Sequence, residues 1–174
     1  MPSSASPRRD PGRGAGEDLR PRLVPAAALR RLRRTVLYAH LQDPDLTNPQ
    51  DERPGAFHLG VMSDSGEALA GASYAPEPLP IQPGRAAYRL RGMAVMPEWQ
   101  HQGLGSALFA AGLNELARRG AEVLWANARD TALDFYRRQD MEPVGNGFLA
   151  AGGLPHHLIV LDMALPRGSQ PGER

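Results

Sequence analysis

The chain contains no cysteine among its 174 residues. Disulfides, cysteine-ligated zinc, iron–sulfur clusters and thiolate catalysis are therefore excluded, and packing alone must stabilise the fold. Lysine is missing as well, because all 20 basic residues are arginines. A Walker-type phosphate loop requires a lysine, so kinases and ATPases of that type are also excluded.

Long apolar runs are absent too. No run approaches the roughly 18 residues that a membrane span needs, and the segment from Met1 to Arg22 lacks the apolar centre of a signal peptide. We therefore expect a cytoplasmic protein without a membrane partner. The length is enough for one domain whose core can enclose a small-molecule site.

Both ends of the chain have few residues to bury. Residues 1–20 are rich in Pro, Ser, Gly and Arg, and residues 166–174 have the same character. We predict a disordered arm over 1–20, a single domain over 21–165 and a disordered tail over 166–174. Nine arginines lie in the first fifth of the chain. A basic arm can bind nucleic acid, but a solvated tail followed by a helix with one charged face is the favoured interpretation.

The hydrophobic pattern between these ends alternates strands with helices. Helical spacing of apolar residues predicts helices over 25–37, 103–119 and 130–139. Short apolar runs bounded by turn residues predict strands over 57–62, 69–74, 87–95, 123–126, 143–149 and 157–163. This order predicts a mixed α/β sheet covered by helices.

Two glycines, Gly103 and Gly105, separate the apolar strand over 87–95 from the clearest helix. A helix N-terminus offers unpaired N–H groups and the positive end of the helix dipole, and glycine lets a polyanion approach the backbone. The turn therefore suits a pyrophosphate. A dinucleotide-binding fold would place a small residue at Leu108 and an acid at Asn127, so the sequence disfavours that fold.

The string Gln100-x-x-Gly103-x-Gly105 resembles the acetyl-CoA signature of the GNAT superfamily of N-acetyltransferases. The flanking segments support the likeness: residues 90–95 look like the family's fourth strand, and residues 127–137 look like its second signature. The resemblance covers about residues 56–165. It implies the acyl-CoA N-acyltransferase fold, with a mixed, mostly antiparallel sheet of about six to seven strands, about four helices and splayed central strands.

The resemblance also implies acetyl-CoA as the donor, with no metal. The pantetheine arm would pair with the backbone of the fourth strand, and the diphosphate would meet the N–H groups of the glycine turn. The expected cofactor-binding residues are Met93, Ala94, Val95, Gln100, His101, Gln102, Gly103, Leu104, Gly105, Ser106 and Asn127.

Tyr136 is the expected catalytic residue, since the family commonly places a tyrosine here to donate a proton to the departing CoA thiolate. A core tyrosine with a satisfied hydroxyl is the alternative interpretation. The acceptor is expected to be an amine of a small molecule or peptide, with His156 and His157 as weaker candidates to contact it.

The proton acceptor is not evident from the sequence. Many relatives use a carboxylate on the fourth or a neighbouring strand, but residues 84–96 contain no acid. A non-catalytic acyl-CoA-binding domain is therefore an open alternative, and so is association of two copies.

Overall fold

The computed structural model describes residues 18–42, 46–150 and 152–164. One sheet of seven strands runs through this part of the chain, in the order β1-β2-β3-β4-β5-β7-β6. The strands are β1 (Arg22–Leu23), β2 (Phe57–Met62), β3 (Ala68–Pro76), β4 (Ala87–Val95), β5 (Val123–Arg129), β6 (Glu142–Leu149) and β7 (Pro155–Asp162). Neighbouring strands are antiparallel except for β4 and β5, which are parallel. The predicted mixed, mostly antiparallel sheet is confirmed.

The described residues form three α-helices, α1 (Arg30–Val36), α2 (Leu104–Arg118) and α3 (Leu133–Arg137). The remaining helical turns are the short 3-10 helices η1 (Ala26–Leu29), η2 (Pro49–Glu52), η3 (Pro97–Trp99) and η4 (Asp130–Ala132). None of the helices in the described ranges is both long and apolar enough to cross a membrane. Most of the predicted arm over 1–20, and the whole of the predicted tail over 166–174, lie outside the described residues.

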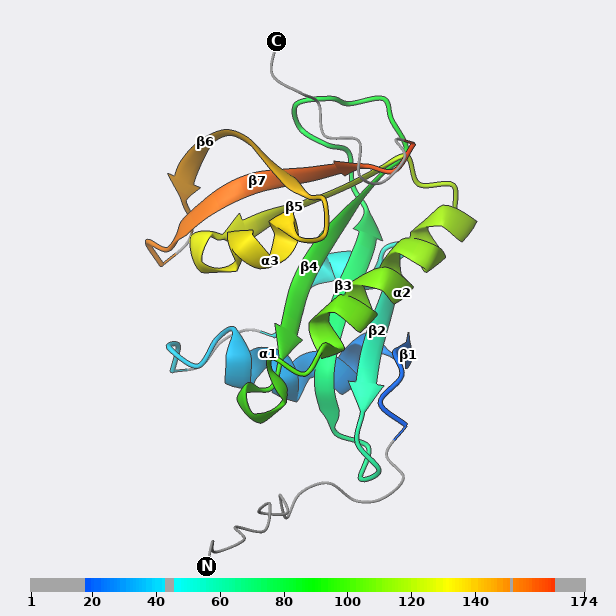
Figure 1. Cartoon of the computed structure of the whole chain (residues 1–174), viewed down its shortest axis with the longest axis vertical. Helices are drawn as coiled ribbons and strands as arrows, with labels where there is room; N and C mark the ends of the chain where they lie inside the picture. Colours follow the sequence, from blue (N-terminus) through cyan, green and yellow to red (C-terminus); the bar gives the residue numbers. More distant parts are fainter. Residues whose placement is uncertain (1–17, 43–45, 151, 165–174) are drawn as a thin grey trace, which may run out of the picture.

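The helices form a layer on each face of the sheet (Figure 1). α2 and α3 cover one face, and α1 covers the other. α2 buries one apolar stripe against the sheet, as its sequence period predicts. The approach is closest at Gly112, where an added Cβ would lie 2.1 Å from the hydroxyl oxygen of Tyr74. Only glycine lets the helix pass this buried tyrosine.

The pairing of β4 with β5 covers only the start of the two strands. Three residues of each strand are in register, from Ala87 to Arg89 in β4 and from Val123 to Trp125 in β5. Beyond them, β4 stays paired with β3 as far as Val95, while β5 stays paired with β7 as far as Arg129. The two central strands therefore diverge, which confirms the expected splay.

Candidate active site

The opening between β4 and β5 is where the ladder hydrogen bonds of the sheet stop. Residues 90–95 of β4 and 126–129 of β5 face it without pairing to each other. An extended ligand can add itself to such an edge through main-chain hydrogen bonds. Met93, Ala94 and Val95, predicted to bind the pantetheine arm, all lie on the β4 side of this opening.

A β-bulge interrupts β4 beside the opening. Gly92 and Met93 together oppose the single residue Ala72 of β3, and Gly92 has a φ of +58°. The extra residue redirects the side chains that follow it. Met93 thus faces α3, whereas Ala94 packs in the core beneath α1, beside Leu29.

The glycine turn lies at the beginning of α2. Gly103 is the N-cap residue, has a φ of +83° and offers no side chain to cap the helix. The first N–H groups of α2 have no partner within the helix, as at any helix start. A Cβ at Gly103 would meet nothing within 4 Å, so the backbone there is open to approach. At Gly105 an added Cβ would lie 3.3 Å from the Phe135 ring, so this glycine lets α3 pack close to the turn.

The polar side chains of the turn are occupied with bracing it. The side-chain amide of Gln100 donates to the Val95 carbonyl oxygen at 3.1 Å, and that of Gln102 donates to the Glu98 carbonyl oxygen at 3.0 Å. His101 has a positive φ of 60°, as a tight turn requires. These two bonds brace the turn from within, and a contact between Gln100 and the cofactor stays a prediction.

Tyr136 extends from α3 to the opening. Its ring is buried against Phe109 and Phe135. Its hydroxyl donates to the sulfur of Met93 at 3.7 Å. Met93 is the residue of β4 that the bulge turns toward α3. Burial raises the pKa of this phenol above its ordinary value, so the hydroxyl keeps its proton at neutral pH. Tyr136 is thus a core residue whose polar end reaches the opening.

The far side of the opening is held by Arg129, which sequence reasoning did not single out. Its guanidinium donates to the Leu37 carbonyl oxygen at 2.8 Å and so connects the end of β5 to the end of α1. Asn127 lies two residues earlier in β5 and is exposed. No periodic pattern reveals such a contact between residues 92 positions apart.

The two candidate histidines face opposite sides of the sheet. His156 pairs across the ladder with Arg129 and lies on the α1 side, where its Nδ1 donates to the Leu154 carbonyl oxygen at 2.8 Å. His157 lies on the α3 side, with its Nδ1 2.8 Å from an Asp130 carboxylate oxygen. Adjacent strand residues alternate between faces. The structure therefore separates two residues that sequence treats alike.

A buried polar cluster on the α1 side was also missed. The Arg33 guanidinium donates to the Asp51 carboxylate at 2.6 Å and to the Ser73 hydroxyl, and His58 Nδ1 lies 2.7 Å from that hydroxyl. Both side chains of the Arg33–Asp51 pair are less than a tenth exposed. Arg33 Nε lies 3.0 Å from where a Cβ of Gly92 would stand, so the cluster packs against the bulge.

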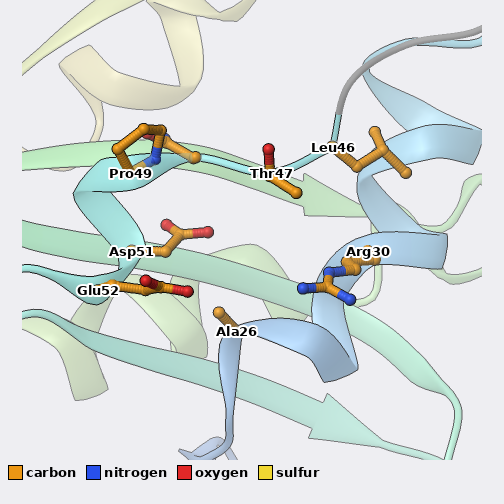
Figure 2. Close-up of a pocket in the computed structure, with 8 residues that line it drawn as sticks. Ala26, Arg30, Leu46, Thr47, Pro49, Asp51 and Glu52 are labelled. Atoms are coloured by element: carbon orange, nitrogen blue, oxygen red, sulfur yellow. The ribbon is translucent and has the colours of Figure 1, made fainter.

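A cavity of about 250 Å³ lies elsewhere on the α1 side. Figure 2 shows the Arg30 guanidinium and the Asp51 and Glu52 carboxylates around it, between the start of α1 and η2. None of the predicted cofactor residues lines it. Among the described residues, no group of three or more His, Cys, Asp or Glu side chains could hold a metal ion.

Comparisons with known proteins agree with this geometry. The sequence model of the Acetyltransferase (GNAT) family matches residues 26–141. YitI of Bacillus subtilis (strain 168), an uncharacterized N-acetyltransferase, is 31% identical over 129 residues, which cover 74% of this chain and 85% of that protein. Mycothiol acetyltransferase of Thermobifida fusca (strain YX) is 32% identical over 113 residues, 64% of this chain and 29% of that protein. An acyl-CoA N-acyltransferase from Pseudomonas aeruginosa has the same fold, with a TM-score of 0.67 at 20% identity over 82% of this chain and 99% of that one.

Proposed function

The chain belongs to the GNAT family of acetyltransferases, and on that premise we propose that it transfers an acetyl group from acetyl-CoA to the nitrogen of an amine. The observation that carries the proposal is the opening between β4 and β5, with the free helix start of α2 at its end. An extended arm with a diphosphate at one end fits these two features together. The amine would belong to a small molecule or a peptide.

The residues present suit the cofactor. Backbone groups of β4 beside the bulge would pair with the pantetheine amides, in the manner of an added strand. The N–H groups of Leu104, Gly105 and Ser106 would bind the diphosphate, and charge-assisted bonds of this kind are stronger than neutral ones. The open space at Gly103 supports this assignment. Asn127 would hold the pantetheine arm from the β5 side.

Tyr136 would act as the general acid. The amine attacks the thioester carbonyl, the C–S bond breaks, and the CoA sulfur leaves as a thiolate that needs a proton. The hydroxyl of Tyr136 already donates to a sulfur atom, that of Met93. A thiolate is a far better acceptor than a thioether, so the proton would pass to it once the arm lies along β4.

His156 is our candidate to receive the proton that the amine loses. Its Nδ1 must carry a hydrogen, because the Leu154 carbonyl oxygen can only accept. In the neutral ring Nε2 therefore has a free lone pair. His156 lies on β7, next to the end of β5 and on the face of the sheet opposite Tyr136, so base and acid would act from opposite faces of the sheet. His157 is already bound to Asp130 and is the weaker candidate.

Release of free thiol from acetyl-CoA, followed over a broad panel of amines, tests the proposed function. We expect thiol release that depends on the amine, together with a mass increase of one acetyl group on the amine. Tight CoA binding without transfer to any amine would instead support a non-catalytic acyl-CoA-binding domain. The cytoplasm stays the expected location.

A further inference from the structure

Three arginines lie on the α1 side of the sheet: Arg89 is at the paired end of β4, and Arg91 and Arg129 are in the segments of β4 and β5 that face the opening. Arg89 and Arg91 of β4 both donate to the Glu77 carboxylate at 2.8 Å, so they share one face. The Arg89 guanidinium lies 4.5 Å over the Trp125 ring, which places Trp125 of β5 on that face as well. Arg129 follows Trp125 by four residues and returns to the same face. We call Arg89, Arg91 and Arg129 the arginine rim.

The arginine rim holds more positive charge than its neighbours neutralise. Glu77 is shared by two guanidinium groups, and although burial raises its pKa, the hydrogen bonds from Arg91 and Arg89 outweigh this effect and lower it. Glu77 is therefore a carboxylate at neutral pH. Arg129 makes no ion pair within the part of the chain that the structure describes, and its guanidinium donates instead to the Leu37 carbonyl oxygen. Two of the three cations thus share one anion, and the third has no anionic partner among the described residues.

Two arginines of the rim have unused donors beside the opening. Arg91 precedes the bulge directly, and its buried Nε has no hydrogen-bond partner among the described residues, as is also true of the Arg89 Nε at the paired end. Such a group costs free energy unless something accepts from it. Arg129 donates through one nitrogen only, which leaves the rest of its planar fork for another acceptor. Both arginines lie on the face opposite α2 and α3, on the side from which an acceptor can reach a thioester held along β4.

We propose that the acceptor is an amino acid, whose carboxylate is bound by Arg91 and Arg129 while its amine points at the opening. This inference rests on the proposed function. Arginine binds carboxylates in a planar, bidentate geometry, and a half-buried excess of positive charge strengthens the pair. The same field opposes the ammonium form of the bound amine and so favours the neutral form that attacks. A simple alkyl amine lacks the carboxylate, so its ammonium form would meet the repulsion without the attraction that offsets it.

Matched acceptors test this proposal. Each amino acid of the common set is compared with its own carboxamide in the thiol-release assay, and kcat/KM is measured for the best pair. We expect the carboxylate to be favoured at least tenfold. The intrinsic reactivity of the amine alone would favour the carboxamide, because a carboxamide makes the neighbouring amine less basic and leaves more of it neutral. A preference for the carboxylate therefore cannot come from amine reactivity. An aminophosphonate analogue shows whether the rim accepts a phosphonate in place of the carboxylate.

The outcomes separate the inference from the proposed function. If the amino acid and its carboxamide are used equally well, or if the carboxamide is preferred, the amino-acid proposal is overturned. The proposed acetyl transfer to amines is not affected by that result. Preference for the aminophosphonate over the carboxylate overturns the assignment to amino acids as well. Transfer to no acceptor, with CoA still bound, contradicts the proposed function and the inference with it.

Variants of the rim assign the effect to its residues. Arg91→Gln and Arg129→Gln should each reduce the carboxylate preference at least tenfold, and Arg129→Lys should retain part of it. Arg118→Gln is the control, since this arginine is exposed on α2 and should leave the preference unchanged. The preference is a ratio and does not depend on how much of each variant is folded. An undiminished preference in both Gln variants would overturn the assignment.

Discussion

The two ends of the β4–β5 pair are held in different ways. At the paired end, the strands are joined by the ladder from Ala87 to Arg89, and an ion pair at 2.7 Å connects Arg85, just before β4, to Asp162 at the end of β7. At the splayed end there is no ladder, and the strands are positioned from outside by contacts to helices. Arg129 is tied to α1, and Tyr136 of α3 reaches Met93.

This difference explains how an opening can persist inside a sheet. Diverging strands leave backbone groups unpaired, which is costly unless something else satisfies them. The Arg129 side chain bonds to the main chain at the end of α1, and the Tyr136 side chain of α3 contacts Met93, so each edge is positioned by a helix. The bulge at Gly92 helps to position the β4 edge, because it turns Met93 toward α3 and Ala94 toward α1. The paired end stabilises the sheet, and the splayed end holds the candidate site.

The largest expected effect concerns the buried pair that supports the bulge. Arg33→Met should lower the free energy of unfolding by about 3–5 kcal/mol, because it leaves the Asp51 carboxylate buried without its cation. Urea denaturation measures this loss. Arg85→Met at the paired end is the control, and it should lose clearly less because the Arg85–Asp162 pair is more exposed. Equal losses at the two ends would contradict the comparison.

Next comes the chemistry of the splayed end. Tyr136→Phe should lower kcat about 100-fold, the lower end of what general acid catalysis contributes, while the Kd for CoA stays within a factor of about two. Tyr74→Phe is a matched control, since Tyr74 is another buried tyrosine of this core and its hydroxyl bonds to none of the residues that the structure describes. Its kcat should not change. If the two variants have the same kcat, Tyr136 is a core residue only.

A smaller effect is expected at the glycine turn. Gly103→Val should raise the Kd for CoA by about tenfold, because a β-branched side chain cannot adopt the φ of +83° without strain and covers the helix start. Gly66→Val is matched closely: Gly66 lies in the β2–β3 turn, has the same φ of +83° and is equally open. Both variants should lose similar stability. An unchanged Kd for CoA in Gly103→Val would contradict the assignment of the diphosphate to this turn.

Sequence patterns predicted the elements on the β4 side of the opening well. The apolar run before Val95, the glycines at 103 and 105 and the stripe of α2 are local patterns, and each maps onto one element of the structure. The position of Tyr136 followed from the family resemblance. Its contact with Met93 did not, because it depends on the bulge, and a bulge is set by how two strands pair rather than by the sequence of one.

The other side of the opening could not be predicted in the same way. Arg129 and Leu37 are 92 positions apart, and Arg33 joins Asp51, Ser73 and the bulge from three further segments. Such contacts come from tertiary packing, for which a single sequence holds no period or motif. The short strand β1 was missed for a related reason: two residues cannot show an alternating pattern. Local patterns predicted the elements on the β4 side, whereas long-range contacts, which no local pattern reveals, hold Arg129 and the bulge.

Backbone amide NMR during a titration with CoA tests the central claim most directly. We predict that shifts concentrate at the splayed end, in residues 93–95 of β4 and 104–106 of α2, while residues 87–89 at the paired end and 47–52 around the cavity of Figure 2 change little. Shifts confined to the paired end or to that cavity would contradict the claim that the opening between β4 and β5 binds the cofactor.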